Sequence, residues 1–260
     1  MSLIAEDAEL WDAVFPGARG RFIERMIGQP GAEILDVGCA TGTVCAHLRR
    51  RGFRTVGLDV NHRFIGAARA KDPGGRYVVG DMRALSLRRK FDVVLCLGTT
   101  LAYNLTNDDV LMTLRGVHRH LVVGGTLIID VLNAIAFGGP RPFQRHTVHK
   151  LTVRGESLTA TIEHRLRLRE QLMTEQVTWR GRRRGRAWAR RDAAESLRLF
   201  FPQELVLFLE VCGFSSIELA DRYTGKSQSF EGRRLIARAR KEGGAVSASD
   251  GASRRARDHR

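Results

Sequence analysis

The first half of the chain alternates between short apolar runs and longer segments in which apolar residues recur every three or four positions. Five runs rich in Val, Leu and Ile predict buried strands, at residues 33–37, 55–59, 76–79, 91–97 and 126–131. Helical spacing lies between them, at residues 42–51, 61–70 and 107–121. Asn61 and Asn107 are expected N-caps, and Gly124-Gly125 is expected to stop the last helix. This alternation indicates an α/β fold whose parallel sheet is covered on both faces.

A different pattern begins near residue 143. Apolar and polar residues alternate at 149–153, 158–168, 172–179 and 196–201, which predicts strands with one solvated face. Pro202 then begins a helix that Gly213 ends, and residues 216–220 and 233–239 predict a closing strand pair. The sequence thus indicates a core of residues 1–135 and 202–241, and a small antiparallel β cap, residues 136–201, inserted after the fifth strand. Residues 242–260 are basic and lack periodicity, so we expect a disordered tail.

A loop with small residues joins the first strand to the first helix. It reads Asp36-Val37-Gly38-Cys39-Ala40-Thr41-Gly42, and small residues let the backbone approach a ligand closely. The Gly38-x-x-x-Gly42 spacing differs from the GxGxxG of dinucleotide sites. Asp36 would repel a pyrophosphate at the helix N-terminus but would attract positive charge. We therefore expect a ligand without phosphate, and S-adenosylmethionine, with its sulfonium and amino groups, fits.

Carboxylates also stand at the ends of the next two strands. Asp59 ends the second strand, and an acid there can accept hydrogen bonds from both ribose hydroxyls. Asp81 ends the third strand and can accept from the adenine amino group, while Met82 offers backbone and apolar contact. Because open α/β sheets bind ligands at the carboxyl ends of their strands, the three carboxylates indicate one site.

Residues 34–43, 57–59, 80–82 and 91–94 together resemble the class I S-adenosylmethionine-dependent methyltransferases, over about residues 10–135 and 200–240. The resemblance implies a Rossmann-like, seven-stranded, mostly parallel sheet with helices on both faces and an antiparallel last strand. In the family, the loop from Asp36 to Gly42 holds the methionine part of the cofactor, Asp59 the ribose and Asp81 the adenine. The expected cofactor-binding residues in the core are Asp36, Gly38, Cys39, Ala40, Thr41, Gly42, Asp59, Val60, Asp81, Met82, Leu97 and Gly98. Ala40 departs from the family pattern, where glycine is frequent.

A narrower resemblance involves the N-terminus. Residues 11–12, 17–20, 80–83, 89–91 and 200–204 are similar to the small-molecule N-methyltransferases that dimethylate nucleotide-linked amino sugars. Those enzymes also carry an antiparallel cap after the fifth strand, and tyrosines of their N-terminal segment close over the cofactor. Trp11 and Phe15 stand at those places here, without the hydroxyl group. Arg19 is expected either to reach the cofactor carboxylate or to be a plain surface charge.

Methyl transfer from a sulfonium is a direct displacement, so the protein must align the reactants and exclude water. An amine acceptor only has to be unprotonated, whereas a hydroxyl acceptor needs a base. The candidate catalytic residues are Tyr103 after the fourth strand, Asn133 after the fifth and His146 at the start of the cap. We expect these residues to position a small-molecule acceptor, an amine being favoured over O- or C-methylation.

The net charge of +15 raises the alternative of a nucleic-acid substrate. Residues 163–191 contain ten Arg against three Glu, with Trp179 and Trp188 interleaved, and such a stretch can bind phosphates and stack bases. However, Leu97-Gly98-Thr99-Thr100 lacks the proline-aromatic motif usual in enzymes that methylate base amino groups. A binding module without turnover is a second alternative. A nicotinamide oxidoreductase is a third, disfavoured by Asp36.

Further expectations concern location and assembly. The acidic residues Glu6, Asp7 and Glu9 argue against a signal peptide, and no apolar run approaches the ~20 residues of a membrane span, so we expect a cytoplasmic protein. The cysteines, expected to be reduced, have no zinc-like spacing, and no metal site is predicted: Cys39, Cys45, Cys96 and Cys212. A monomer or a homodimer is expected.

Overall fold

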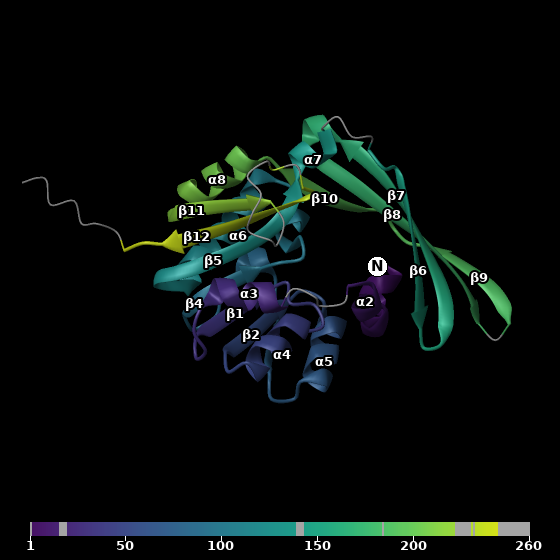
Figure 1. The fold of residues 1–260 in the computed structure, drawn as a ribbon, viewed down its shortest axis with the longest axis horizontal. Coiled ribbons are helices and arrows are strands. Elements are labelled where there is room, and N and C mark those ends of the chain that lie inside the picture. The colour runs from purple at the N-terminus through teal and green to yellow at the C-terminus, as the bar shows by residue number, and fades with distance from the viewer. Residues whose placement is uncertain are drawn as a thin grey trace, which may run out of the picture.

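The computed structural model describes residues 2–15, 20–138, 143–183, 185–221, 230 and 232–243. Within them, seven strands form the core sheet in the order β3-β2-β1-β4-β5-β12-β11 (Figure 1). The strands are β1 (Glu33–Val37), β2 (Arg54–Asp59), β3 (Arg76–Val79), β4 (Phe91–Cys96), β5 (Leu121–Asn133), β11 (Phe214–Asp221) and β12 (Arg234–Lys241). β12 runs antiparallel to β5, and β1 to β5 are mutually parallel. The predicted Rossmann-like, mostly parallel core is confirmed, but the connected sheet has twelve strands among the described residues instead of the expected seven.

Helices cover both faces of this sheet. The helices are α3 (Gly20–Ile27), α4 (Thr43–Arg50), α5 (His62–Lys71), α6 (Asn107–His120), α7 (Ala134–Gly138) and α8 (Pro202–Val211). On one face, Leu114 of α6 and Leu209 of α8 pack into the largest apolar cluster. On the other, Ile23 of α3 and Leu48 of α4 pack against the sheet in a second cluster. Each helix buries one apolar stripe, as the sequence spacing predicts.

Two local predictions were wrong. The cap of α6 is Thr106, whose hydroxyl accepts from the Asp109 N–H at 3.1 Å, so Asn107 is the first helical residue instead. The helix ends at His120, and Gly124-Gly125 lies inside β5 rather than at a helix end. The register of β4 against β5 shifts between Phe91 and Val93, and Gly124 has a φ of +80°. The two glycines therefore lie where β5 departs from regular pairing with β4. The sequence alone did not distinguish such a strand irregularity from the end of a helix.

The strands of the predicted cap form an antiparallel extension of the same sheet. They are β6 (His146–Val153), β7 (Glu156–Arg167), β8 (Leu172–Arg183), β9 (Arg186–Arg191) and β10 (Glu195–Phe200). β9 and β10 both pair with β8, and β10 also pairs in parallel with β5 at Leu199↔Leu132. The twelve strands among the described residues are thereby connected. β9 was not predicted, because its arginines leave little apolar alternation.

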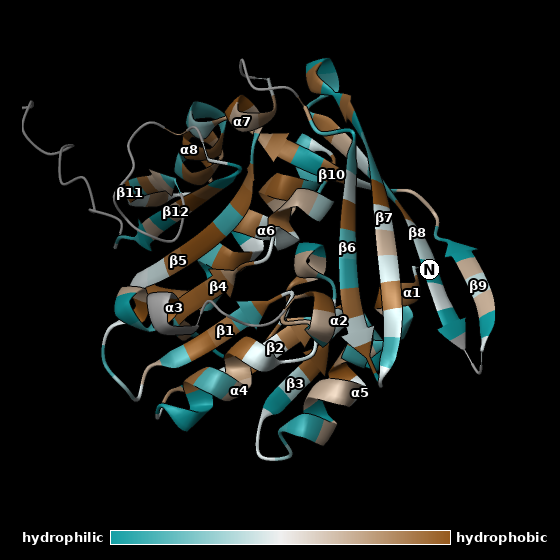
Figure 2. Ribbon diagram, turned by 45° about the vertical axis from the view of Figure 1, so that its right-hand side comes forward, coloured by the Kyte–Doolittle hydropathy of each residue, from teal (hydrophilic) through white to brown (hydrophobic). Residues whose placement is uncertain are grey.

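Two short N-terminal helices lie between the cap strands and the core (Figure 2). They are α1 (Leu3–Glu6) and α2 (Ala8–Val14). Leu10 is buried with Leu158 and Trp179 of the cap strands. On the other side, the Trp11 ring lies 4.8 Å from that of Phe64 in α5. The N-terminal segment therefore joins the cap strands to the helix that follows β2.

Candidate cofactor and acceptor site

The loop after β1 is held against the end of β2 by its own backbone. The Gly38 and Cys39 N–H groups donate to the Leu58 carbonyl at 2.7 and 3.0 Å, and the Ala40 N–H donates to Asp59 Oδ2 at 2.8 Å. Gly38, Ala40 and Gly42 all have positive φ, of 74°, 47° and 75°. Ala40 therefore adopts a conformation that glycine takes more readily, at a cost of about 1 kcal/mol. Gly42 then caps α4, so the loop leads directly into a helix N-terminus.

Asp36 is buried beneath this loop, with 3% of its surface exposed. Burial, together with the nearby Asp59 carboxylate, raises its pKa to about 7, although the Cys45 thiol, 3.5 Å away, donates to it. The carboxyl group thus changes charge near neutral pH. A cation beside it would stabilise the ionised form.

We expect the affinity for S-adenosylmethionine to increase from pH 6 to pH 8. Ionised Asp36 attracts the cationic cofactor, and the loss below pH 7 approaches about tenfold per pH unit if only the ionised form binds. We expect the stability of the free protein to show the opposite trend. Burial raises the pKa of Asp36 from its ordinary value of 3.8 to about 7 in the folded state, so its contribution to stability is complete below pH 3.8 and disappears as pH rises through about 7. Calorimetric titration with S-adenosylmethionine across this pH range measures the affinity. The Asp36→Asn variant should bind with an affinity that no longer changes with pH. If its affinity changes with pH as that of the wild type does, the role of Asp36 is contradicted.

Asp59 ends β2 and faces the loop. Besides the Ala40 N–H, it accepts from the Asn61 N–H at 2.8 Å, and burial raises its pKa. Asn61 caps α5 by accepting from the Arg63 N–H, as predicted. Val60, between them, is 70% exposed and offers a free apolar surface. Asp59 therefore anchors the loop through one oxygen and the start of α5 through the other.

Asp81 follows β3 and caps the short 3-10 helix η1 (Met82–Ala84). Both of its oxygens accept from the Arg83 guanidinium, the shortest contact being 2.6 Å, and this hydrogen bonding lowers the Asp81 pKa. Met82 is half-buried, and its sulfur accepts from Asn104 Nδ2 at 3.8 Å. Asp81 is therefore an ionised acceptor at the third strand end.

The N-terminal helices cover this region. Thr41 Oγ1 donates to Asp12 Oδ1 at 2.5 Å, and Asn61 Nδ2 donates to the Ala5 carbonyl at 2.8 Å. The Trp11 ring also lies 4.6 Å from that of Phe15, which is 50% exposed. Arg19 lies outside the described residues, as does the tail from residue 244 onward. The predicted aromatic residues thus lie near the loop, tied to it through Asp12.

Tyr103 lies at the end of the 3-10 helix η2 (Thr100–Tyr103), which packs against β5 and β10. Before it, Leu97 is buried and Gly98 has a φ of +68°. The Tyr103 ring is 49% exposed. Desolvation by the surrounding chain and the carboxylates of Glu195 and Glu175 raise its pKa, so the phenol stays protonated at neutral pH. Tyr103 can donate a hydrogen bond there but cannot serve as a base.

The structure places the other two candidate catalytic residues differently from expectation. Asn133 is fully buried, and its Nδ2 donates to the Phe230 and Gly232 carbonyls at 2.6 and 2.9 Å. Its amide thus fixes the chain before β12. His146 of β6 pairs with Glu163 of β7. Because Leu158 and Ala160 of β7 face α2 and side chains alternate along a strand, Glu163 and its partner His146 lie on the opposite face of the cap. Neither position favours contact with an acceptor.

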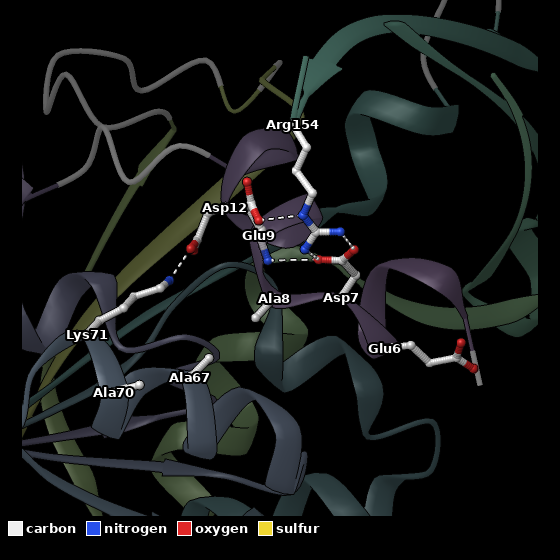
Figure 3. Close-up of a pocket in the computed structure, with 9 residues that line it drawn as sticks. All are labelled: Glu6, Asp7, Ala8, Glu9, Asp12, Ala67, Ala70, Lys71 and Arg154. Atoms are coloured by element: carbon white, nitrogen blue, oxygen red, sulfur yellow. Dashed lines mark hydrogen bonds and ion pairs between the residues drawn. The ribbon is translucent and has the colours of Figure 1, made fainter. Parts of the chain in front are cut away.

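A cavity of about 550 Å³ lies between α2, α5 and the β6–β7 turn (Figure 3). It is lined by charged residues that pair with one another, Arg154 with Asp7 and Glu9, and Lys71 with Asp12. None of the three strand-end carboxylates lines it. This cavity is therefore separate from the predicted cofactor site.

Of the two tryptophans in the basic stretch of the cap, Trp179 is buried and cannot stack on a base, and Trp188 is partly buried against the same apolar cluster. Trp179 is 1% exposed, and its indole N–H donates to Asp192 at 2.8 Å. Arg190 pairs with Glu6 and Asp192.

The described residues contain no group of three or more His, Cys, Asp or Glu arranged to hold a metal ion. No helix in the described part is long and apolar enough to cross a membrane.

Comparison with known proteins identifies the class. Residues 34–125 match the model of a methyltransferase domain, and this segment contains the loop, Asp36, Asp59 and Asp81. The fold matches a S-adenosylmethionine-dependent methyltransferase from Clostridium acetobutylicum with a TM-score of 0.77, at 17% identity, over 93% of this chain and 100% of the other. Residues 34–125 are thus similar to a methyltransferase domain, and the fold is that of S-adenosylmethionine-dependent methyltransferases, in agreement with the resemblance that the sequence showed.

More specific relatives act on amino sugars. The chain is 30% identical to dTDP-4-amino-2,3,4,6-tetradeoxy-D-glucose N,N-dimethyltransferase of Saccharopolyspora spinosa over 162 residues, 54% of this chain. It spans 65% of that relative's length. A sugar N-methyltransferase from a Streptoalloteichus species matches with a TM-score of 0.73 at 22% identity, over 87% of this chain and 88% of the other.

Proposed function

We propose that this protein transfers the methyl group of S-adenosylmethionine to an amine nitrogen of a small-molecule acceptor, in a biosynthetic pathway. The observation that carries the proposal is the placement of Asp36, Asp59 and Asp81 at three successive strand ends around the Gly38–Gly42 loop. Such a set suits a cationic nucleoside without phosphate. The similarity to N-methyltransferases of amino sugars supports the nitrogen as acceptor atom.

In this proposal the residues of the first three strand ends bind the cofactor. Asp36, with the loop backbone from Gly38 to Gly42, holds the methionine part; Asp59 accepts from the ribose, with Val60 against the base. Asp81 and Met82 hold the adenine edge, and Leu97 and Gly98 close the site from β4. The donor set fits, because buried Asp36 can pair with the positive charge of the cofactor, while the partly buried Asp59 and Asp81 can accept hydrogen bonds from its uncharged groups.

The protein's contribution to the reaction is binding and alignment. When bound, S-adenosylmethionine supplies an activated methyl group whose sulfur leaves without charge, so the chain needs no acid. The N-terminal helices, tied to the loop through Asp12 and Thr41, exclude water from one side of the site. Tyr103 stays protonated, and neither Asn133 nor His146 is placed to act as a base, so none of the three candidate catalytic residues supplies the base that a hydroxyl acceptor needs.

A labelled-methyl transfer assay tests the proposal. We expect the purified protein to transfer label from S-adenosylmethionine to an amine in a host extract, with a product 14 mass units heavier for one methyl and 28 for two (roughly, by the mass of each added CH₂). Fragmentation locates the methyl on nitrogen. Label on oxygen or carbon would overturn the choice of acceptor atom, label on RNA or DNA would favour the nucleic-acid alternative, and bound cofactor without any product would indicate a binding module.

A further inference from the structure

On the inner face of the cap strands, the one that contacts α2 and the core, β8 is apolar on either side of Glu175. At one end, Met173 and Leu197 join the main apolar cluster of the core. At the other end, Leu158 and Trp179 pack around Leu10 of α2. Side chains on one face of a strand recur every second residue, so Glu175 lies between Met173 and Trp179 on this same face. The two apolar ends therefore flank a short stretch that no apolar cluster covers.

Strand register brings three titratable side chains together in this stretch. Glu175 of β8 pairs directly with Glu195 of β10 on one side and with His164 of β7 on the other. Directly paired residues of antiparallel strands project from the same face, about 5 Å apart. His164 Nδ1 lies 3.3 Å from Glu175 Oε1, without the alignment of a hydrogen bond, and the His164 side chain is 12% exposed. Its Nε2 contacts Thr147 Oγ1 at 3.0 Å, which fixes the ring.

The two glutamates lack basic partners. The chain has 43 Lys and Arg residues, yet neither Glu175 nor Glu195 forms an ion pair with one of them in the part of the chain that the structure describes. On the outer face of the same strands, by contrast, Glu163 pairs with Arg165 and Arg191. The carboxylates of Glu175 and Glu195 on the inner face therefore have no Lys or Arg partner among the described residues, whereas that of Glu163 on the outer face has two.

Tyr103 connects this stretch to the methyl-donor side. The carboxylates of Glu195, Glu175 and Asp59 all raise the pKa of its phenol, so the three carboxylates lie near Tyr103. It is also half-exposed, although η2 packs against β5 and β10. Because β10 carries Glu195 and pairs with the strand of Glu175, the packing of η2 against β10 places Tyr103 beside the strands of the two glutamates.

We propose that Glu175 and Glu195 bind the amine of the acceptor in its positively charged form and stabilise the charge that the nitrogen gains on methylation. This inference rests on the proposed function. The amine loses a proton to water, its lone pair forms the N–C bond as the C–S bond breaks, and the positive charge moves from sulfur to the methylated nitrogen. Carboxylates fixed beside that nitrogen favour the developing charge. His164, beside Glu175, and Tyr103, on the 3-10 helix that packs against β10, act as positioning residues.

Binding of two small probes tests this inference without turnover. Cyclohexylamine is a cation at neutral pH, and cyclohexanol is its neutral counterpart of similar shape. With the protein saturated by S-adenosylhomocysteine, we expect calorimetry to show at least tenfold tighter binding of the amine. Glu175→Gln and Glu195→Gln should each reduce this preference, and the double variant should abolish it. Glu163→Gln, on the outer face, is the matched control and should bind as the wild type does.

The outcomes separate this inference from the proposed function. Equal binding of both probes to the wild type, or an unchanged amine preference in the double variant, overturns the role of the glutamates even if the transfer assay yields N-methylated product. If the transfer assay places the methyl on oxygen or carbon, the proposed function fails instead. Unchanged S-adenosylmethionine affinity in Glu175→Gln and Glu195→Gln supports the inference, because it shows that the cofactor site is intact, and a large loss in both variants contradicts their assignment to the acceptor side.

Discussion

Replacing Asp59 by alanine is expected to weaken S-adenosylmethionine binding by roughly 10- to 100-fold. In the proposed site this carboxylate accepts from the ribose, and hydrogen bonds to charged groups contribute about 1.5–3 kcal/mol. The carboxylate also holds the loop, since it accepts from the Ala40 and Asn61 N–H groups, both at 2.8 Å. The alanine variant therefore loses both a ligand contact and the anchor of the loop, and titration calorimetry measures the sum.

Asp92 provides a matched control for this measurement. Its carboxylate likewise accepts from a backbone N–H, that of Glu33, at 2.8 Å. However, Asp92 lies near the amino end of β4, whereas Asp59 lies at the carboxyl end of β2. Asp92→Ala should leave the cofactor affinity unchanged. Asp59→Asn, which keeps an acceptor for the Ala40 N–H but loses the charge, should fall between wild type and alanine. Equal affinities in Asp59→Ala and Asp92→Ala would refute the ribose assignment.

Replacing Gly38 by alanine is expected to lower the melting temperature by roughly 5–15 °C and to abolish measurable cofactor binding. A Cβ at this position would lie 2.3 Å from Thr100 Oγ1 and 2.4 Å from Thr100 Cγ2, and the backbone φ is +74°. The left-handed conformation costs about 1–2 kcal/mol and the steric clash about 1–3 kcal/mol more. A loss of 1 kcal/mol lowers the melting temperature by about 2–4 °C in a domain of this size. Relief of the clash would displace either the loop or η2, and both border the proposed site.

Gly124→Ala separates the strain from the clash. Gly124 has a similar φ of +80°, but an added Cβ would meet no atom within 4 Å. Its variant should show only the conformational cost and should bind the cofactor normally. Combining Gly38→Ala with Thr100→Gly should restore part of the lost melting temperature. If Gly38→Ala and Gly124→Ala are equally stable and bind equally well, close packing of the loop against Thr100 is not required.

The first five strands could be predicted because each is a continuous buried run. Ile34, Leu35 and Val37 of β1 are fully buried, and a strand covered on both faces needs apolar residues at every such position. The loop could be predicted for a related reason, since Gly38 and Gly42 adopt positive φ where other residues are strained. These features are local, so the sequence carries them in adjacent positions.

The acceptor side could not be predicted in the same way. His146 was selected as a candidate because it begins the cap, yet its pairing with Glu163 puts it on the outer face. The residues on the inner face, His164, Glu175 and Glu195, come from three strands and meet only through the register of β7, β8 and β10. The alternation within each strand was visible in the sequence, but a shift of one residue in the register would exchange the two faces.

By itself the sequence determined the class of this protein: a parallel α/β core with carboxylates at three successive strand ends around a glycine loop. Those features depend on backbone conformation and on burial within single elements, and both are recorded in local residue patterns. Tertiary structure alone decided how β10 joins the cap strands to β5, that α1 and α2 bridge the cap to the loop, and which cap residues face Tyr103. These outcomes depend on contacts between residues far apart in the sequence, from 29 positions for Asp12 with Thr41 to 189 for Leu3 with Asp192, and no short-range pattern encodes such contacts.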